Sequence, residues 1–155
     1  MPGMFADKPE DFGMIYQWNR KTGWPTTGSV TGWPTDSPGP SATWAAENDP
    51  CPTGWRVPTK EQLQSLADAA IGFALYSGVK GAFFGGAVPN QIFLPAAGYR
   101  LSGGTRGGVG DYGDYWSNLS NGSWVYGLWS LYDDYVVVND DGDLIFGCSV
   151  RCVKK

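Results

Sequence analysis

One amphipathic segment limits the helical content that this chain can reach. Thr59 and Gln62 have the spacing of a capping box, and Glu61 falls in the first turn, where the helix dipole favours an acidic side chain. Apolar side chains then follow at the i, i+3, i+4, i+7 and i+8 positions: Leu63, Leu66, Ala67, Ala70 and Ile71. This spacing predicts a helix over residues 59–71 with one buried stripe.

The rest of the chain favours short strands joined by loops. Gly (23) and Pro (11) make up about a fifth of the 155 residues, but an aromatic content of 15% argues against disorder. Short strands are predicted at residues 14–18, 91–95, 115–117 and 147–153, and a second helix is predicted near 73–84. We therefore expect a single α+β domain in which one or two helices pack on small antiparallel sheets.

Charge and residue usage argue against several classes of function. The chain has no histidine, which is the commonest general base and the commonest metal ligand. Residues 101–150 carry seven Asp and one Arg, and such an acidic segment repels phosphate backbones, so nucleic acid is not an expected partner. No stretch approaches transmembrane length and no signal peptide is visible at residues 1–18, so direct membrane insertion is not expected.

Residues 101–150 also have an unusual composition. They contain Asp but no Glu, Arg but no Lys, and no Gln, Met, Ala or Pro. Turn preference explains part of this pattern, since Asp and Gly suit loops. A mutational process produces the same pattern. If the first two bases of an adenine–adenine–pyrimidine codon are randomised, the codon cannot encode Lys, Glu, Gln, Met or Trp. The residues of this segment that depart from the rule are Trp116, Trp124 and Trp129. The pattern favours a segment that has been diversified by mutation.

Four ordered motifs carry a resemblance to a known family. They lie at residues 49–59 (DPCPTGWRVPT), 94–100 (LPAAGYR), 115–117 (YWS) and 149–153 (SVRCV). This frame resembles the Fibrobacter succinogenes major paralogous domain, a family similar to the C-type-lectin-like fold. The family includes variable proteins of diversity-generating retroelements in Bacteroidetes and their phages. The resemblance covers about residues 44–155, and Cys148 stands where the family usually has an aromatic residue.

The resemblance implies a division of the chain and a location. It divides the chain into an irregular first segment (1–43), a scaffold (44–100), a variable ligand-binding region (101–147) and a closing strand (148–155). Many members are exported lipoproteins, so a cell surface or a phage particle is the implied location, although no leader is visible. The aromatic residues of the frame are expected to be largely buried, namely Trp55, Tyr99 and Trp116.

The expected function is recognition of a macromolecular ligand, protein or glycan, without enzymatic activity. Tyr and Trp give a binding surface large contact area at low entropic cost, so the many aromatics of the variable region favour exposure over packing inside a small loop-rich domain. The residues expected to lie mostly exposed on one face are Asp111, Tyr112, Asp114, Trp124, Tyr126, Trp129, Leu131, Tyr132, Asp133, Tyr135, Asp141 and Asp143. The rival hypotheses are a carbohydrate-binding surface module that stacks sugars on Trp and, more remotely, a hydrolase with paired carboxylates.

Cysteines and clustered aspartates raise two further questions. Three cysteines allow one disulfide and one free thiol. We expect Cys51 beside Cys152, with Cα atoms within about 7 Å, the limit for bridging. Cys148, expected on the same strand face as Cys152, is the alternative partner. The acidic run at residues 140–143 lacks the spacing of an EF-hand loop, so a solvated loop is favoured over a calcium site, and we expect no metal, no cofactor and no catalytic residue.

Overall fold

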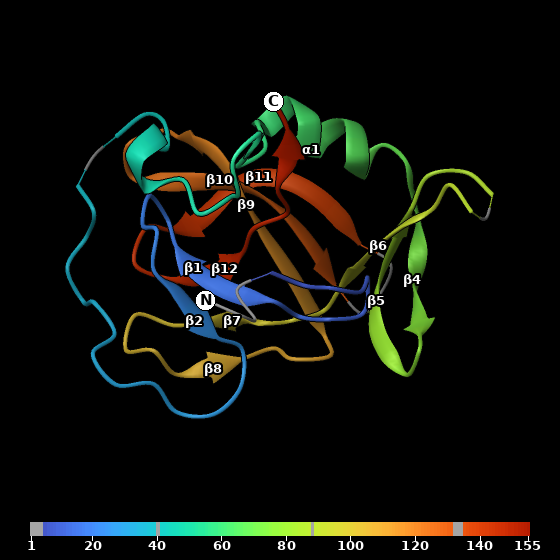
Figure 1. The fold of residues 1–155 in the computed structure, drawn as a ribbon, viewed down its shortest axis with the longest axis horizontal. Helices are drawn as coiled ribbons and strands as arrows, with labels where there is room; N and C mark the ends of the chain where they lie inside the picture. Colours follow the sequence, from blue (N-terminus) through green and yellow to red (C-terminus); the bar gives the residue numbers. More distant parts are fainter. Residues whose placement is uncertain (1–4, 40, 88, 132–134) are drawn as a thin grey trace.

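The computed structural model describes residues 5–39, 41–87, 89–131 and 135–155. Within them one α-helix, α1 (Lys60–Ala67), packs against the largest of three β-sheets in an α+β arrangement (Figure 1). The predicted capping box is confirmed. The Gln62 backbone N–H donates to the Thr59 hydroxyl at 3.2 Å, and the Thr59 N–H donates to the Gln62 side-chain oxygen at 3.0 Å. No helix in this described part of the chain is long and apolar enough to cross a membrane.

The helix ends earlier than the sequence predicts. Its last residue is Ala67, and the following Asp68 N–H donates to the Gln64 carbonyl at 2.8 Å. Ala70 and Ile71 were expected on the buried stripe, but both lie in a strand and are exposed. The prediction is wrong for the last turn because strand pairing takes up the backbone groups that a longer helix would have used.

A β-hairpin stands where a second helix was expected. The strands β4 (Ala70–Tyr76), β5 (Val79–Phe84) and β6 (Ile92–Pro95) form an antiparallel sheet in that order. Ser77 and Gly78 join β4 to β5, and both have positive φ angles, 49° and 81°. Two residues with positive φ are what a tight hairpin turn of the primed type requires. The helix predicted near 73–84 is therefore wrong, whereas the strand predicted at 91–95 is confirmed.

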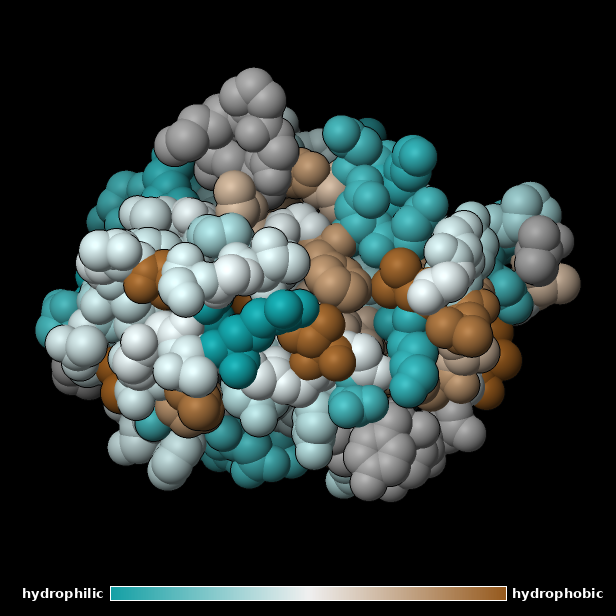
Figure 2. Space-filling view, turned by 90° about the horizontal axis from the view of Figure 1, so that it is seen from below, coloured by the Kyte–Doolittle hydropathy of each residue, from teal (hydrophilic) through white to brown (hydrophobic). Residues whose placement is uncertain are grey.

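The hairpin carries much of the exposed apolar surface. In Figure 2 hydrophobic residues, coloured brown, gather at the right side of the molecule, which is the side where β4 and β5 lie in Figure 1. The large exposed apolar side chains of this sheet are Ile71, Leu75, Tyr76 and Ile92.

The largest sheet joins strands from both ends of the chain. Its order is β11 (Val136–Asp143), β10 (Trp124–Leu131), β9 (Tyr112–Ser120), β12 (Gly147–Ser149), β1 (Met14–Gln17) and β2 (Gly23–Pro25), and β7 (Tyr99–Arg100) and β8 (Arg106–Gly107) branch from β12. The strand β12 runs antiparallel to β1 and parallel to β9. Pairing of β1 with β12 places two segments that are far apart in the sequence side by side.

The end of the chain leaves this sheet. After β12 the backbone breaks away and forms β13 (Val153–Lys154), which pairs with β3 (Trp55–Arg56). The continuous strand expected over 147–153 is therefore wrong. A disulfide joins Cys51 to Cys152 with a Cα–Cα distance of 5.8 Å, while Cys148 is free and buried. A short 3-10 helix (Ala46–Asn48) precedes the disulfide in the sequence.

Two apolar clusters hold the sheet in place. The first is aromatic, and the Trp18 and Trp116 indole N–H groups in it donate to backbone carbonyls of Ser117 and Tyr16 at 3.0 and 2.8 Å. The second lies beneath α1 and contains Leu63, Phe84, Leu94, Tyr115 and Leu128. The two clusters lie on opposite faces of β9. Adjacent residues of that strand therefore pack into different clusters, Trp116 into the first and Tyr115 into the second.

The frame aromatics are buried to different degrees. Trp116 has no exposed surface, as predicted, and Tyr99 is half-buried. Trp55 is 44% exposed, so the prediction of burial is wrong for this residue. The reason is its position in a two-residue strand at the protein surface, where it pairs with β13 and follows three exposed residues.

Arg100 organises the irregular segment that follows β2. Its guanidinium is buried and donates to the carbonyls of Pro25, Thr27, Gly28 and Gly104, at distances between 2.6 and 3.3 Å. These bonds satisfy carbonyl groups for which the loop offers no strand partner. They also fix the β7–β8 hairpin that borders the candidate site described next.

Candidate functional site

Strands β9, β10 and β11 present one face toward α1 and the other away from it. Directly opposed residues of antiparallel strands share a face. Trp129 stands opposite Asp114 in β9, and Gly127 stands opposite both Trp116 in β9 and Asn139 in β11. Asp114, Trp129 and Asn139 therefore project away from α1. We call the surface formed by Tyr112, Asp114, Trp129 and Asn139 the Asp114 face.

Trp129 lies close against the sheet because two glycines leave room for its ring. A Cβ at Gly127 would stand 2.6 Å from the Trp129 ring, and one at Gly142 would stand 3.0 Å from it. Trp116 supports the ring edge-on, with centroids 5.8 Å apart and planes at 81°. The Trp129 indole N–H is buried and has no hydrogen-bond partner among the described residues. The ring is thus fixed by packing and keeps an unused donor.

Asp114 places a carboxylate beside this ring. The residue is half-buried, and no hydrogen bond or ion pair to its side chain is found in the described part of the chain. Burial raises the pKa of Asp114 to about 7. Burial, and to a lesser extent the Asp114 charge, raises the pKa of the Cys148 thiol, which identifies Cys148 as a near neighbour. A desolvated carboxylate without a partner costs stability, and such groups concentrate at functional sites.

Tyrosine rings and an amide complete the face. Tyr112 and Tyr99 meet edge-on, with ring centroids 5.9 Å apart, and the missing side chain of Gly108 leaves space for both rings. In β11 the Asn139 side-chain amide N–H donates to the Asp141 carboxylate at 2.6 Å. The Asn139 side-chain oxygen is buried without a partner among the described residues. The Asp114 face therefore combines aromatic rings with an unpaired donor and an unpaired acceptor.

The twelve residues expected on one face are divided by the structure. Asp111, Trp124, Tyr135 and Asp141 are exposed, whereas Tyr112, Asp114, Tyr126, Trp129 and Asp143 are half-buried. Tyr132 and Asp133 lie outside the described residues, and for Leu131 only the backbone, at the end of β10, is described.

A single shared face is wrong for some of them. Tyr126 lies on the helix side, since the Lys60 amino group stands 4.0 Å from the centre of its ring. Asp111 approaches Lys80 of β5, with 3.9 Å between charged atoms. The physical reason is strand alternation. Tyr126 and Trp129 are three positions apart, and an odd separation in a strand directs side chains to opposite faces.

The acidic run at residues 140–143 forms the end of β11, so the predicted loop is wrong there, and its carboxylates are not gathered at one point. Asp140 accepts from the Asn121 amide at 2.7 Å, and Asp143 accepts from the Ile145 backbone N–H at 3.1 Å. No group of three or more His, Cys, Asp or Glu side chains that could hold a metal ion occurs among the described residues. These aspartates are used in local turns and strand-edge hydrogen bonds.

Sequence reasoning missed Asn139 and the glycines that accommodate Trp129. Gly127 and Asn139 lie opposite each other in the pairing of β10 with β11. They can be recognised as neighbours only when the register of these two strands is known. Tyr99 was expected in the core as a frame residue, but its ring borders the Asp114 face beside Tyr112.

The chain matches no protein-family model, no curated protein and no solved structure. Its function is therefore inferred from the geometry of the Asp114 face and from the composition of residues 101–150.

Proposed function

We propose that this protein is a non-enzymatic binding protein that recognises a macromolecular ligand, protein or glycan, through the Asp114 face. The observation that carries the proposal is the coincidence of unpaired polar groups with fixed aromatic rings. Asp114, the Trp129 indole N–H and the Asn139 side-chain oxygen are all without hydrogen-bond partners in the described structure. A ligand that supplied a partner to the partly accessible Asp114 carboxyl would recover the cost of burying that group unpaired.

The geometry favours binding over catalysis. Acid–base catalysis needs a second group within hydrogen-bond reach of the first or across a bound substrate. The unpaired neighbours of Asp114 on this face are an indole N–H and an amide, which donate or accept hydrogen bonds but do not titrate near neutral pH. A hydrolase is therefore the less favoured function.

We further propose a C-type-lectin-like fold and diversification by a retroelement. Pairing of β1 with β12 and the Cys51–Cys152 disulfide support a closed frame. The strands β8 to β11 come from residues 101–147, the region with the restricted composition. The exposed side chains of this region, such as Trp124 and Tyr135, lie outside both apolar clusters, so they can vary while the core is kept. A reverse-transcriptase gene with a near-copy repeat of this region, beside the gene for this chain, would test the diversification.

A carbohydrate-binding module is the second candidate, and the Trp129 platform favours it. A half-exposed indole ring beside a carboxylate and an amide offers stacking for a sugar ring and hydrogen bonds for its hydroxyls. The two candidates differ in ligand class but share the same residues.

The experiment compares binding of the full chain and of matched variants to a glycan array and to a panel of bacterial cells. The test variant carries Asp114→Asn and Trp129→Phe, and the control carries Asp7→Asn and Trp55→Phe at exposed positions outside the face. We expect the test variant to lose at least tenfold in binding and the control to lose none. Binding to defined glycans favours the module, and equal binding by both variants refutes the proposal.

A further inference from the structure

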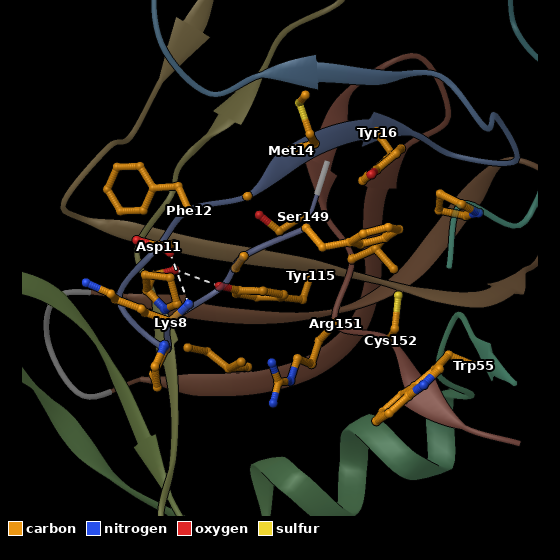
Figure 3. A pocket seen from close by; sticks show the side chains of 18 of the residues that line it. Lys8, Asp11, Phe12, Met14, Tyr16, Trp55, Tyr115, Ser149, Arg151 and Cys152 are labelled. Carbon is orange, nitrogen blue, oxygen red and sulfur yellow. Dashed lines mark hydrogen bonds between the residues drawn. The ribbon is translucent and has the colours of Figure 1, made fainter. Parts of the chain in front are cut away.

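A cavity that includes Tyr115 of β9 in its lining is not part of the Asp114 face. It has a volume of about 290 Å³. Its walls come from the first described segment (residues 5–13), from β1, β6 and β9, and from residues 149–152. Figure 3 shows side chains from these segments pointing toward a common space. The volume lies near the lower end of the range for ligand pockets, so a small molecule fits it better than a chain segment.

Most of the lining is apolar and firmly held. Phe93, Leu94 and Pro95 of β6 are buried, and Tyr115 fixes its hydroxyl by donating to the Pro95 carbonyl at 2.8 Å. Phe12, which belongs to the first described segment, also lines the cavity. That segment is held by Asp11, which accepts from the Lys8 backbone N–H at 3.0 Å. Such a lining favours a flat apolar body.

One buried polar residue among those that line this cavity has a side-chain oxygen without a partner. Ser149 is 3% exposed, and its hydroxyl oxygen forms no hydrogen bond with any described residue. The neighbouring Arg151 lines the same cavity and has no ion pair within the described structure. In Figure 3 Tyr115 lies between Ser149 and Arg151 along one wall. A hydroxyl donor and a guanidinium on one wall are suited to a carboxylate.

The charges around the cavity indicate a singly charged anion. The charged side chains that line it are Lys8, Asp11 and Arg151, which together carry a net charge of +1. The tyrosines that line it stay neutral, since burial raises the pKa of both Tyr16 and Tyr115. Arg151 also lines a second, more open hollow of about 450 Å³ beside α1, with Trp55 between the two. The guanidinium can therefore be approached from solvent.

We propose that this cavity binds a small organic acid with a flat apolar body, whose carboxylate lies between the Ser149 hydroxyl and the Arg151 guanidinium. The apolar body packs against β6 and Tyr115. This site is separate from the proposed macromolecular ligand site, since Tyr115 belongs to the cluster beneath α1 and Asp114 projects to the other face. It also accounts for the unpaired Ser149 hydroxyl.

The test uses phenylacetate and its neutral analogue phenylacetamide as probes, followed by amide shifts in ¹H–¹⁵N spectra of the full chain. We expect phenylacetate to shift amides of residues 149–152 and to bind about tenfold more tightly than phenylacetamide, the usual gain from one charge-assisted hydrogen bond. Equal affinities, or shifts confined to other segments, would overturn the proposal.

Variants then separate the two contacts. Arg151→Gln should weaken phenylacetate about tenfold and leave phenylacetamide unchanged, while Ser149→Ala should weaken phenylacetate severalfold. Lys155→Gln is the matched control, because it removes a cation from the same terminal segment but does not line the cavity. The Lys155 variant should bind both probes as the parent does. If it loses as much phenylacetate affinity as Arg151→Gln, the attraction is a general charge effect and the assigned site is wrong.

Discussion

Replacing Asp114 by Asn should stabilise the protein at neutral and alkaline pH. Burial raises the pKa of this carboxyl from 3.8 to about 7 in the folded protein. Three units correspond to about 4 kcal/mol between the protonated and charged forms. Asp114 is only half-buried, so solvent screening reduces this figure to about 2–4 kcal/mol.

The sign follows from proton binding. Between pH 4 and 7 the folded protein keeps the Asp114 proton while the unfolded chain has released it, so the free energy of unfolding falls as the pH rises. The Asn variant has no such proton. The stability difference between the variant and the parent should therefore be small at pH 4, grow through pH 7 and level off above pH 8. The chain has no histidine, and the ordinary carboxyls that titrate near pH 4 are shared by variant and parent, so they cancel in the difference.

Urea unfolding at intervals from pH 4 to 9 measures this difference directly. Asp7→Asn is the control, since Asp7 is exposed and the difference between it and the parent should stay flat with pH. Parallel stability curves for Asp114→Asn and the parent would refute the reasoning, because they would show that Asp114 is well solvated in the folded state. A stability gain with loss of ligand binding would show that the carboxylate is retained for recognition.

Two further predictions concern the frame. Removing the Cys51–Cys152 disulfide by a double Ala substitution should lower the free energy of unfolding by about 2–5 kcal/mol, because the bridge joins residues 101 positions apart. Reductant should not change the urea unfolding of this variant. A urea midpoint equal to that of the oxidised parent would contradict the prediction. Gly142→Ala should cost about 1–3 kcal/mol, because its Cβ would overlap the Trp116 ring, whereas Gly103→Ala, with open space around it, should be nearly neutral. Equal melting temperatures for the two glycine variants would contradict the close packing of the Trp116 ring against Gly142.

Sequence patterns predicted the fold where the signals were local. The capping box at Thr59 depends on residues three positions apart, and the sequence placed the helix start correctly. The helix end could not be predicted from the apolar stripe, because Ala70 and Ile71 fit a helix face and a strand equally well. Their strand conformation depends on pairing with β5 across the turn at Gly78, which is a tertiary contact.

The candidate site was predictable in composition but not in arrangement. Residues 101–147 were expected to form a ligand-binding face, and Asp114 and Trp129 do lie together on one face of the sheet. Tyr126 does not, because register and alternation direct it toward Lys60 on the helix. The Asn139 contribution depends on strand pairing across Gly127, and no local pattern encodes that pairing.

The disulfide also determines how the chain bears mechanical load. Tension that enters through β1 and leaves through β13 passes from Cys51 directly to Cys152, so the residues between them are bypassed. The strands β9, β10 and β11 lie within this closed loop, as does α1. Under oxidising conditions a pull on the two ends therefore puts no tension on the backbone of β9, β10 and β11. Reduction of the bridge would expose those strands to the full force.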